Sequence, residues 1–189
     1  ITNGAKIIIA PGFLQATAMR TVAIENPEVK FIFVDGWSLT DKVDEKGNDC
    51  GTPLKNVTAI IYKEQESGYL AGYAAVKEGY RHLGFLGGMA VPAVVRFGYG
   101  YVQGADAAAQ ELGLEDGAIE IEFGYTGGFS PSPEIKTQMD GWYADGAEVV
   151  FACGGGIYLS VTAAAEEAGK KVIGVDVDQS GESTTVITS

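Results

Sequence analysis

The feature that most constrains the fold of this chain is a regular alternation of short apolar runs with longer amphipathic segments. The apolar runs have the length of buried strands, and the segments between them repeat at helical spacing. Strands that alternate with helices form βαβ units, in which the strands are parallel and helices cover the sheet. We therefore predict an α/β fold with parallel sheets.

The pattern locates about eight strands. They are predicted at 6–10, 30–34, 56–62, 82–86, 118–123, 148–153, 171–175 and 185–188. The helices are predicted at 13–26, 64–79, 93–112, 133–145 and 157–168. In the first helix, Leu14, Ala18, Val22 and Ala23 have the spacing of one buried face. The stretch 37–55 has no period and is expected to be a long loop.

This number of strands exceeds what one small lobe holds, so we expect two Rossmann-like lobes. The predicted organisation is a partial N-terminal lobe at 1–64, a C-terminal lobe at 65–178, and a segment at 179–189 that crosses back to the N-terminal lobe. A first lobe with only about three or four strands is small for a layer of this type. We therefore expect the chain to be incomplete at both ends.

Composition excludes several classes of protein. The chain has 25 acidic and 13 basic residues, a formal net charge of −12, and no cluster of lysine or arginine. Such a chain repels a phosphate backbone, so nucleic acid is not expected as a partner. No apolar run approaches the roughly 20 residues that a bilayer span requires.

Cysteine and histidine are too few for a zinc site or a histidine-based triad. The chain has Cys50, Cys153 and one histidine, His82, and no serine lies in a nucleophile elbow. The cysteines lack the spacing of metal ligands, so they are free thiols unless folding brings them together as a disulfide. We expect no enzyme activity, no metal and no cofactor.

Polar groups follow the predicted strand at 171–175, where residues 174–180 read GVDVDQS. In an open parallel sheet, ligands bind at the carboxyl ends of the strands. Asp176 is therefore the first candidate ligand contact. Asp35 follows the strand at 30–34 in the same way, and it either contacts a ligand or caps the following turn.

Other candidates also fall at predicted crevice edges. Gly154 and Gly155 follow a strand and open a helix, and without a phosphate-loop motif we expect close backbone approach to a sugar. Phe13 follows a Pro-Gly turn. Phe129, in a loop between glycines and Ser-Pro-Ser-Pro, is either a core aromatic or a ligand contact. Arg96 is explained equally well by an ion pair.

Five segments resemble one known group in their order and spacing. They are FIFVDG at 31–36, GYLAG at 68–72, GFLGG at 84–88 with Val91-Pro92, Gly98-Tyr99 followed by Gly104-Ala105, and GVDVDQ at 174–179. Together they resemble the basic membrane protein family of substrate-binding lipoproteins, the nucleoside-binding components of certain ABC importers. The resemblance implies the fold of type I periplasmic binding proteins, with a nucleoside closed between two lobes.

The resemblance also implies roles for individual residues. Asp176 matches the aspartate that binds the ribose, and an ionised carboxylate can accept hydrogen bonds from two vicinal hydroxyls. Phe129 falls where the family has an aromatic clamp for the base, and such stacking contributes about 1–3 kcal/mol. Gly127 and Gly128 stand where the family has a serine. The family's N-terminal Ser-Phe-Asn motif and the lysine after Thr-Ser are expected to be missing.

The leading interpretation is an extracytoplasmic solute-binding protein that captures a nucleoside between its lobes and delivers it to an ABC transporter permease. It would be periplasmic, or held at the membrane surface by a lipid anchor that is not in this chain. The alternatives are a ligand-sensing receptor or repressor effector domain, a sugar-binding protein of the same fold, and an enzyme acting on nucleosides.

Overall fold

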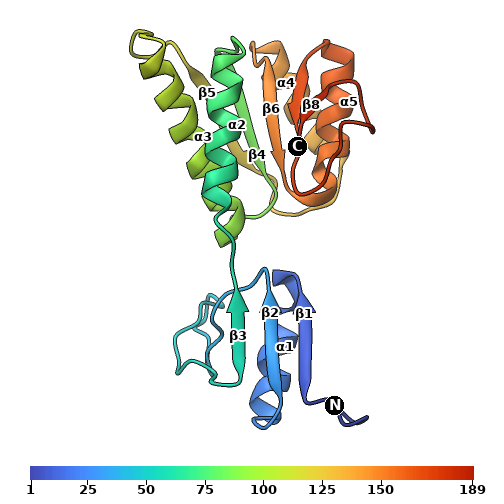
Figure 1. Ribbon diagram of the computed structural model, residues 1–189. Coiled ribbons are helices and arrows are strands. Elements are labelled where there is room, and N and C mark those ends of the chain that lie inside the picture. The colour runs from blue at the N-terminus through green and yellow to red at the C-terminus, as the bar shows by residue number, and fades with distance from the viewer. The chain divides into compact units, whose positions relative to one another are not determined.

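The computed structural model describes residues 1–189 and contains two compact units, Ile1–Tyr62 and Lys63–Ser189 (Figure 1). Each unit has its own sheet, and all strands that pair within the two sheets are parallel. This confirms the predicted α/β class. The division between the units falls two residues before the expected boundary after residue 64.

The first unit has a three-stranded sheet in the order β1-β2-β3. A short turn of 3-10 helix, η1, and the helix α1 connect β1 to β2 and cover one face of the sheet. Their bounds are β1 Ile7–Pro11, η1 Phe13–Gln15, α1 Ala16–Glu25, β2 Lys30–Val34 and β3 Val57–Ile60. The opposite face is open, with Ile7 and Ile9 each 63% exposed. Parallel sheets are normally covered on both faces, so an exposed apolar face is unusual for a sheet of this type.

The buried face of α1 agrees with the prediction at Val22 and Ala23, which pack in the core of the first unit, but not at the other two positions. Leu14 is 75% exposed and Ala18 is also exposed, whereas Ala16, Met19 and Ala23 pack on the sheet. The first three residues after the Pro-Gly turn form η1, so Leu14 precedes the α-helix. Because 3-10 and α-helix have different periods, the face that meets the sheet is rotated from the one that the sequence spacing indicated.

The long loop between β2 and β3 was predicted and contains only isolated bridges. Asp49 anchors it, because its carboxylate accepts two hydrogen bonds of 2.9 Å from Arg20 of α1. The same carboxylate accepts hydrogen bonds from the Trp37 indole at 2.8 Å and from the Thr40 amide at 2.6 Å. One buried acidic side chain therefore holds the loop to the helix.

The second unit has a five-stranded sheet in the order β5-β4-β6-β7-β8. Alternate residues of the strands face opposite helical layers. Phe85 and Phe151 pack with α2 and α3, whereas Leu86 and Val150 pack with α4 and α5. The bounds are α2 Glu64–Lys77, β4 His82–Gly87, α3 Pro92–Glu111, β5 Glu120–Tyr125, α4 Pro133–Ala144, β6 Val149–Cys153, η2 Gly155–Ile157, α5 Tyr158–Ala168, β7 Lys171–Ile173 and β8 Val186–Thr188.

Helices α2 and α3 pack unusually closely through glycine. α2 contributes Gly68 and Gly72 to the contact, and α3 contributes Gly100 and Gly104. A Cβ added at any of these positions would collide with a backbone carbonyl of the other helix. The two backbones can therefore lie this close only because side chains are missing on both sides.

We predicted that the segment 179–189 crosses back to the N-terminal lobe, and within this range it adds a strand to the sheet of the second unit. It places β8 beside β7, where the amide of Val172 donates to the carbonyl of Thr185 at 3.0 Å and that of Gly174 to Thr188 at 2.8 Å. Val186 is buried in the core shared by α4 and α5. The physical reason is that packing against this core removes the apolar side chain from water, which lowers the free energy of the folded chain.

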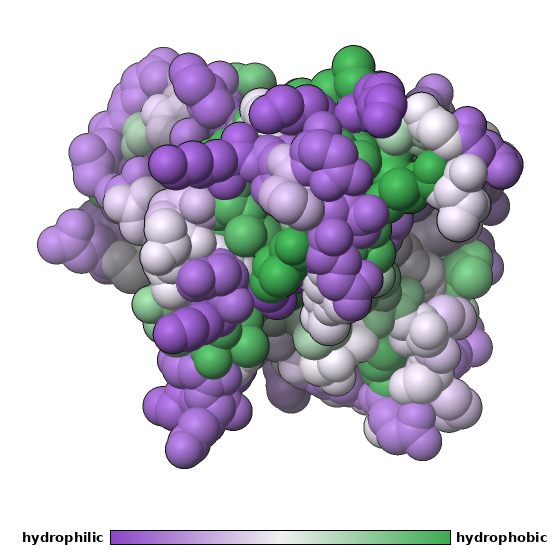
Figure 2. Space-filling view, turned by 90° about the horizontal axis from the view of Figure 1, so that it is seen from below, coloured by the Kyte–Doolittle hydropathy of each residue, from purple (hydrophilic) through white to green (hydrophobic).

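None of the helices has both the length and the apolar composition needed to cross a membrane. Hydrophilic residues cover much of the face shown in Figure 2, with hydrophobic patches between them. A surface of this mixture agrees with a chain in which 20% of residues are charged.

Candidate functional site

The strand order of the second unit locates its ligand edge. From β4 the chain proceeds to β5 on one side, and β6 then lies on the other side of β4. In open α/β sheets, such a reversal leaves a crevice at the carboxyl ends of the two strands. Here those ends are Gly87-Gly88 after β4 and Gly154-Gly155 after β6.

The two strand ends meet through their backbones. The amide of Gly88 donates to the carbonyl of Cys153 at 3.0 Å. A Cβ placed on Gly154 would lie 2.8 Å from the nitrogen of Gly88, so a side chain cannot be accommodated there. Gly154 is buried by this contact, whereas Gly155 is exposed and has a left-handed φ of 51°. Of the two predicted glycines, only Gly155 has an exposed backbone.

Phe129 lies in the loop between β5 and α4, at the same edge. Its carbonyl accepts a hydrogen bond of 2.8 Å from the amide of Gly156, and its ring lies where a side chain of Gly88 would be. The ring is half-buried against the core of the second unit. It also lines a cavity of about 320 Å³ together with Ser130 and Ser132 of the loop and residues of α4. The structure thus gives Phe129 a packing role and leaves part of the ring facing open space.

Asp176 follows β7 at the same edge of the sheet. Its φ is 70°, a left-handed conformation that is uncommon for residues other than glycine. Gln179 stabilises the turn through two hydrogen bonds. Its side-chain oxygen accepts from the backbone amide of Val175 at 3.1 Å, and its backbone amide donates to the hydroxyl of Ser189 at 3.0 Å. The sequence GVDVDQS therefore builds a turn that projects a carboxylate.

The surroundings of Asp176 are mostly apolar. The residue lines a cavity of about 490 Å³ with Phe97, Phe151 and the side chains of α2, and Ser67, Thr188 and Ser189 add hydroxyl groups. Asp176 is exposed, but the apolar walls beside its carboxyl remove part of the surrounding water and raise the pKa of Asp176 above its ordinary value. An apolar cavity with few polar groups is typical of sites for small ligands, which measure about 300–1,000 Å³. Asp176 and Phe129 line different cavities of this edge.

Two further groups set the electrostatics near this cavity. Burial, together with the negative charges of Asp176 and Glu64, raises the pKa of the Cys153 thiol, which disfavours the thiolate form at neutral pH. Arg96 of α3 forms an ion pair of 2.5 Å with the buried Glu64 at the start of α2. The ion-pair interpretation of Arg96 is thereby confirmed. Cys50 and Cys153 are both free.

In the first unit, Asp35 and Phe13 lie at the carboxyl end of its sheet. Asp35 follows β2 with a left-handed φ of 54°, and Phe13 opens η1 after β1. The amide of Gly12 donates to the carbonyl of Val34 at 2.9 Å, which ties these two strand ends together. Both side chains are half-buried.

The sequence did not reveal the contribution of α2 to the cavity of Asp176. Ser67, Leu70, Ala71 and Ala74 line it. Their spacing is also typical of a helix face that packs on the core. Which of these side chains line the cavity depends on the close approach of α2 to α3. No group of three or more histidine, cysteine or carboxylate side chains is arranged to hold a metal ion.

Comparison with known proteins gives one family. A family model described as "ABC transporter substrate-binding protein PnrA-like" matches residues 2–189. The ABC transporter nucleoside-binding protein BmpA of Lactococcus lactis subsp. cremoris is 34% identical over 186 residues, which cover 94% of this chain and 47% of that protein. Basic membrane protein B of Borreliella burgdorferi is 31% identical over 181 residues, with 94% and 48% covered. The chain spans about half the length of these curated relatives.

Solved structures agree with this fold. An ABC transporter solute-binding protein from Aeropyrum pernix matches 99% of this chain and 51% of its own, with a TM-score of 0.75 and 24% identity. A transcriptional activator of the comK gene from Bacillus halodurans matches 99% and 58%, with a TM-score of 0.71 and 19% identity. At these identities the likeness concerns the fold alone, and it confirms the predicted type I periplasmic binding protein fold.

Proposed function

Because the chain belongs to the family of PnrA-like ABC transporter substrate-binding proteins, we propose that its protein captures a nucleoside outside the cytoplasm and delivers it to an ABC importer. Nucleoside binding is named for the relative BmpA. The family binds its substrates and hands them on, so we expect reversible binding without turnover. Since the chain spans about half of its relatives, the proposal concerns the whole protein.

The observation that carries the proposal is the placement of Asp176. A carboxylate held in a left-handed turn at the carboxyl edge of the sheet, beside an apolar cavity, can accept hydrogen bonds from two adjacent hydroxyls. A ribose presents such a pair. We propose that Asp176 binds the 2′ and 3′ hydroxyls while the apolar wall excludes water.

Phe129 and Gly155 are the proposed supporting contacts. The open part of the Phe129 ring would stack on the base, and the exposed backbone of Gly155 lets a sugar approach closely. Asp35 and Phe13 are the candidate contacts of the first unit, at the carboxyl end of its own sheet.

A free sugar is the second candidate ligand. It is favoured by the same observation, because Asp176 and the nearby hydroxyls of Ser67 and Ser189 recognise a polyol irrespective of a base. Dependence of binding on Phe129 separates the two ligands, since a base stacks on an aromatic ring whereas a free pentose offers less to stack.

Isothermal titration of the whole purified protein against purine and pyrimidine nucleosides, with ribose and galactose as alternatives, tests the proposal. We expect saturable nucleoside binding that Asp176→Ala abolishes and Phe129→Ala weakens by roughly tenfold. Asp145→Asn, an exposed aspartate at the end of α4, is the matched control and should bind normally. Absence of binding to every nucleoside would overturn the proposal. Binding of a sugar alone would replace it with the second candidate.

A further inference from the structure

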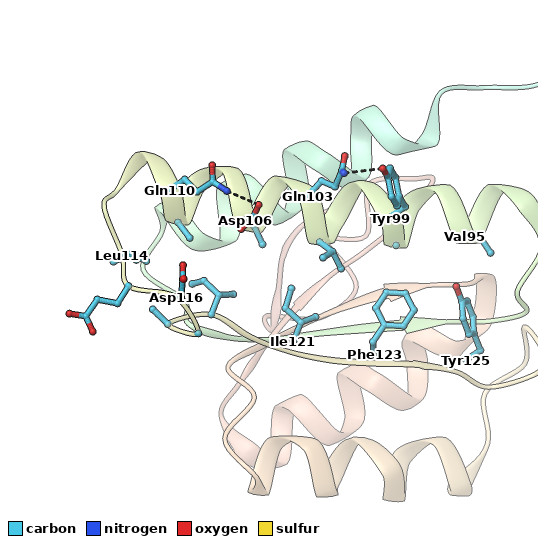
Figure 3. Close-up of a pocket in the computed structure, with 18 residues that line it drawn as sticks. Val95, Tyr99, Gln103, Asp106, Gln110, Leu114, Asp116, Ile121, Phe123 and Tyr125 are labelled. Carbon is cyan, nitrogen blue, oxygen red and sulfur yellow. Dashed lines mark hydrogen bonds between the residues drawn. The ribbon is translucent and has the colours of Figure 1, made fainter.

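A groove runs between α3 and β5 and shares Tyr125, but no other lining residue, with the cavity of Phe129. It encloses about 920 Å³. Figure 3 shows that Val95 and Tyr99 of α3 and Ile121, Phe123 and Tyr125 of β5 line it. Tyr99 is 61% exposed and Phe123 is 44% exposed. Large side chains of two elements therefore face a shared space without filling it.

The same strand has an open edge. β5 is the terminal strand of the sheet and pairs only with β4. The amides of Glu120 and Thr126 donate to carbonyls at the β4 side, at 2.9 Å each. Because backbone groups alternate along a strand, the N–H and C=O groups of Ile121, Phe123 and Tyr125 point to the open edge. The residues whose side chains line the groove thus also supply the hydrogen-bonding groups.

The opposite face of β5 is acidic. The side chains of Glu120 and Glu122 are 73% and 39% exposed, and the nearest basic group is His82 of β4, at 3.8 and 3.6 Å. Asp106 and Asp116 line the groove itself and are not on this opposite face. A strand added at this edge would place alternate side chains in the apolar groove and the others beside these glutamates.

We propose that this groove docks an extended segment of a partner protein in which apolar and basic residues alternate. The segment would extend the sheet as a sixth strand, with its apolar side chains beneath α3 and its lysine or arginine side chains beside Glu120 and Glu122. Backbone hydrogen bonds supply affinity, and the alternation supplies specificity.

Charge distinguishes this partner from a second copy of the chain. Pairing of β5 with its own copy would bring glutamates of two strands together, and like charges opposite each other destabilise a sheet. Two chains of net charge −12 also repel each other at a distance. The acidic residues thus oppose self-association at an edge that stays attractive to a basic strand.

A labelled peptide of alternating valine and lysine tests the proposal by fluorescence anisotropy with the purified chain. We expect saturable binding that weakens roughly tenfold in a Glu120→Lys, Glu122→Lys double variant and with Phe123→Ser. Two control peptides have the same composition: one has its valines and lysines in separate blocks, and the other is methylated on every backbone amide. Both should bind roughly tenfold more weakly. Circular dichroism verifies that each variant is folded.

Three results would overturn the proposal. One is absence of binding by the alternating peptide. Another is equal binding of the alternating and block peptides, which charge attraction alone produces. The third is self-association of the unmodified chain that Phe123→Ser abolishes, which would assign the groove to a second copy. None of these results depends on Asp176 or on nucleoside binding.

Discussion

Asp35 and Asp176 adopt the same left-handed backbone conformation, with φ of 54° and 70°, and no other non-glycine residue of the chain does so. Each lies just beyond the carboxyl end of a parallel strand, one in each unit. Such a conformation costs a residue with a side chain about 1–3 kcal/mol, and glycine adopts it freely. Aspartate at both positions, in a chain with 27 glycines, agrees with a role for the carboxylates.

The first prediction separates strain from function at Asp176. Asp176→Gly should preserve or raise thermal stability, because glycine relieves the left-handed strain, while nucleoside binding is lost with the carboxylate. Asp176→Ala should lower stability by about 1 kcal/mol, since alanine tolerates this conformation less well than aspartate. Thermal denaturation and titration of both variants provide the comparison. Retained binding in both variants would remove the carboxylate from the site.

The pKa of Asp176 predicts how ligand affinity depends on pH. Partial loss of water around the exposed carboxyl raises this pKa above its ordinary value, so the carboxylate takes up a proton at a higher pH than an ordinary aspartate. A protonated Asp176 loses its acceptor strength, and nucleoside affinity should fall as the pH drops through the raised pKa. Titrations at a series of pH values measure this, and Asp176→Asn should show weak binding with no such dependence.

Asp49 should make the first unit sensitive to acid. Burial opposes its ionisation, but the hydrogen bonds from Thr40, Trp37 and Arg20 outweigh burial and lower its pKa. The folded pKa lies below the unfolded one, so the stabilisation is present above the unfolded pKa and is lost as the pH falls through the folded pKa.

Removing the Asp49 charge tests this directly. Asp49→Asn should destabilise the first unit by about 1–3 kcal/mol, because it leaves the partly buried Arg20 without its partner. Hydrogen exchange of the first unit measures the loss. Asp44→Asn, which removes a carboxylate from an exposed turn of the same loop, should have a smaller effect. Equal effects of the two substitutions would show that Asp49 does not anchor the loop.

The glycine contact between α2 and α3 predicts opposite outcomes for two similar substitutions. Gly72→Ala should destabilise the second unit by about 1–3 kcal/mol, because its Cβ would meet the carbonyl of Tyr101. Gly141→Ala should instead stabilise it by about 0.5–1 kcal/mol, because Gly141 lies within α4 with no atom near an added Cβ. Urea denaturation distinguishes the two results. Destabilisation by both would mean that helix geometry other than this contact is responsible.

The two cysteines should differ in reactivity. Cys50 is exposed, whereas Cys153 is buried with its thiol pKa raised by burial and by nearby negative charge. A thiol reagent at neutral pH should therefore modify Cys50 rapidly and Cys153 only when the second unit opens. Mass spectrometry over time measures both rates. Rapid modification of Cys153 in the folded chain would contradict the buried environment.

Much of the fold follows from local periodicity. The strand at 30–34 and the long loop after it occur as predicted, and the other strands and the helices depart from their predicted bounds by a few residues. The type of each element is encoded within the element itself, by the period of its apolar residues. Likewise, GVDVDQS predicts a polar turn after an apolar strand from local sequence, although the strand itself ends at Ile173, two residues earlier than predicted.

Tertiary structure alone decided how these elements combine. The pairing of β8 with β7, the rotated buried face of α1 and the opening between α3 and β5 each depend on contacts between segments far apart in sequence. Asp176 illustrates both levels: sequence placed it at a strand end, but its left-handed conformation and raised pKa come from the turn that Gln179 and Ser189 hold and from the apolar wall beside it. Local sequence specifies conformational preference, whereas burial and electrostatics arise only when distant segments exclude water together.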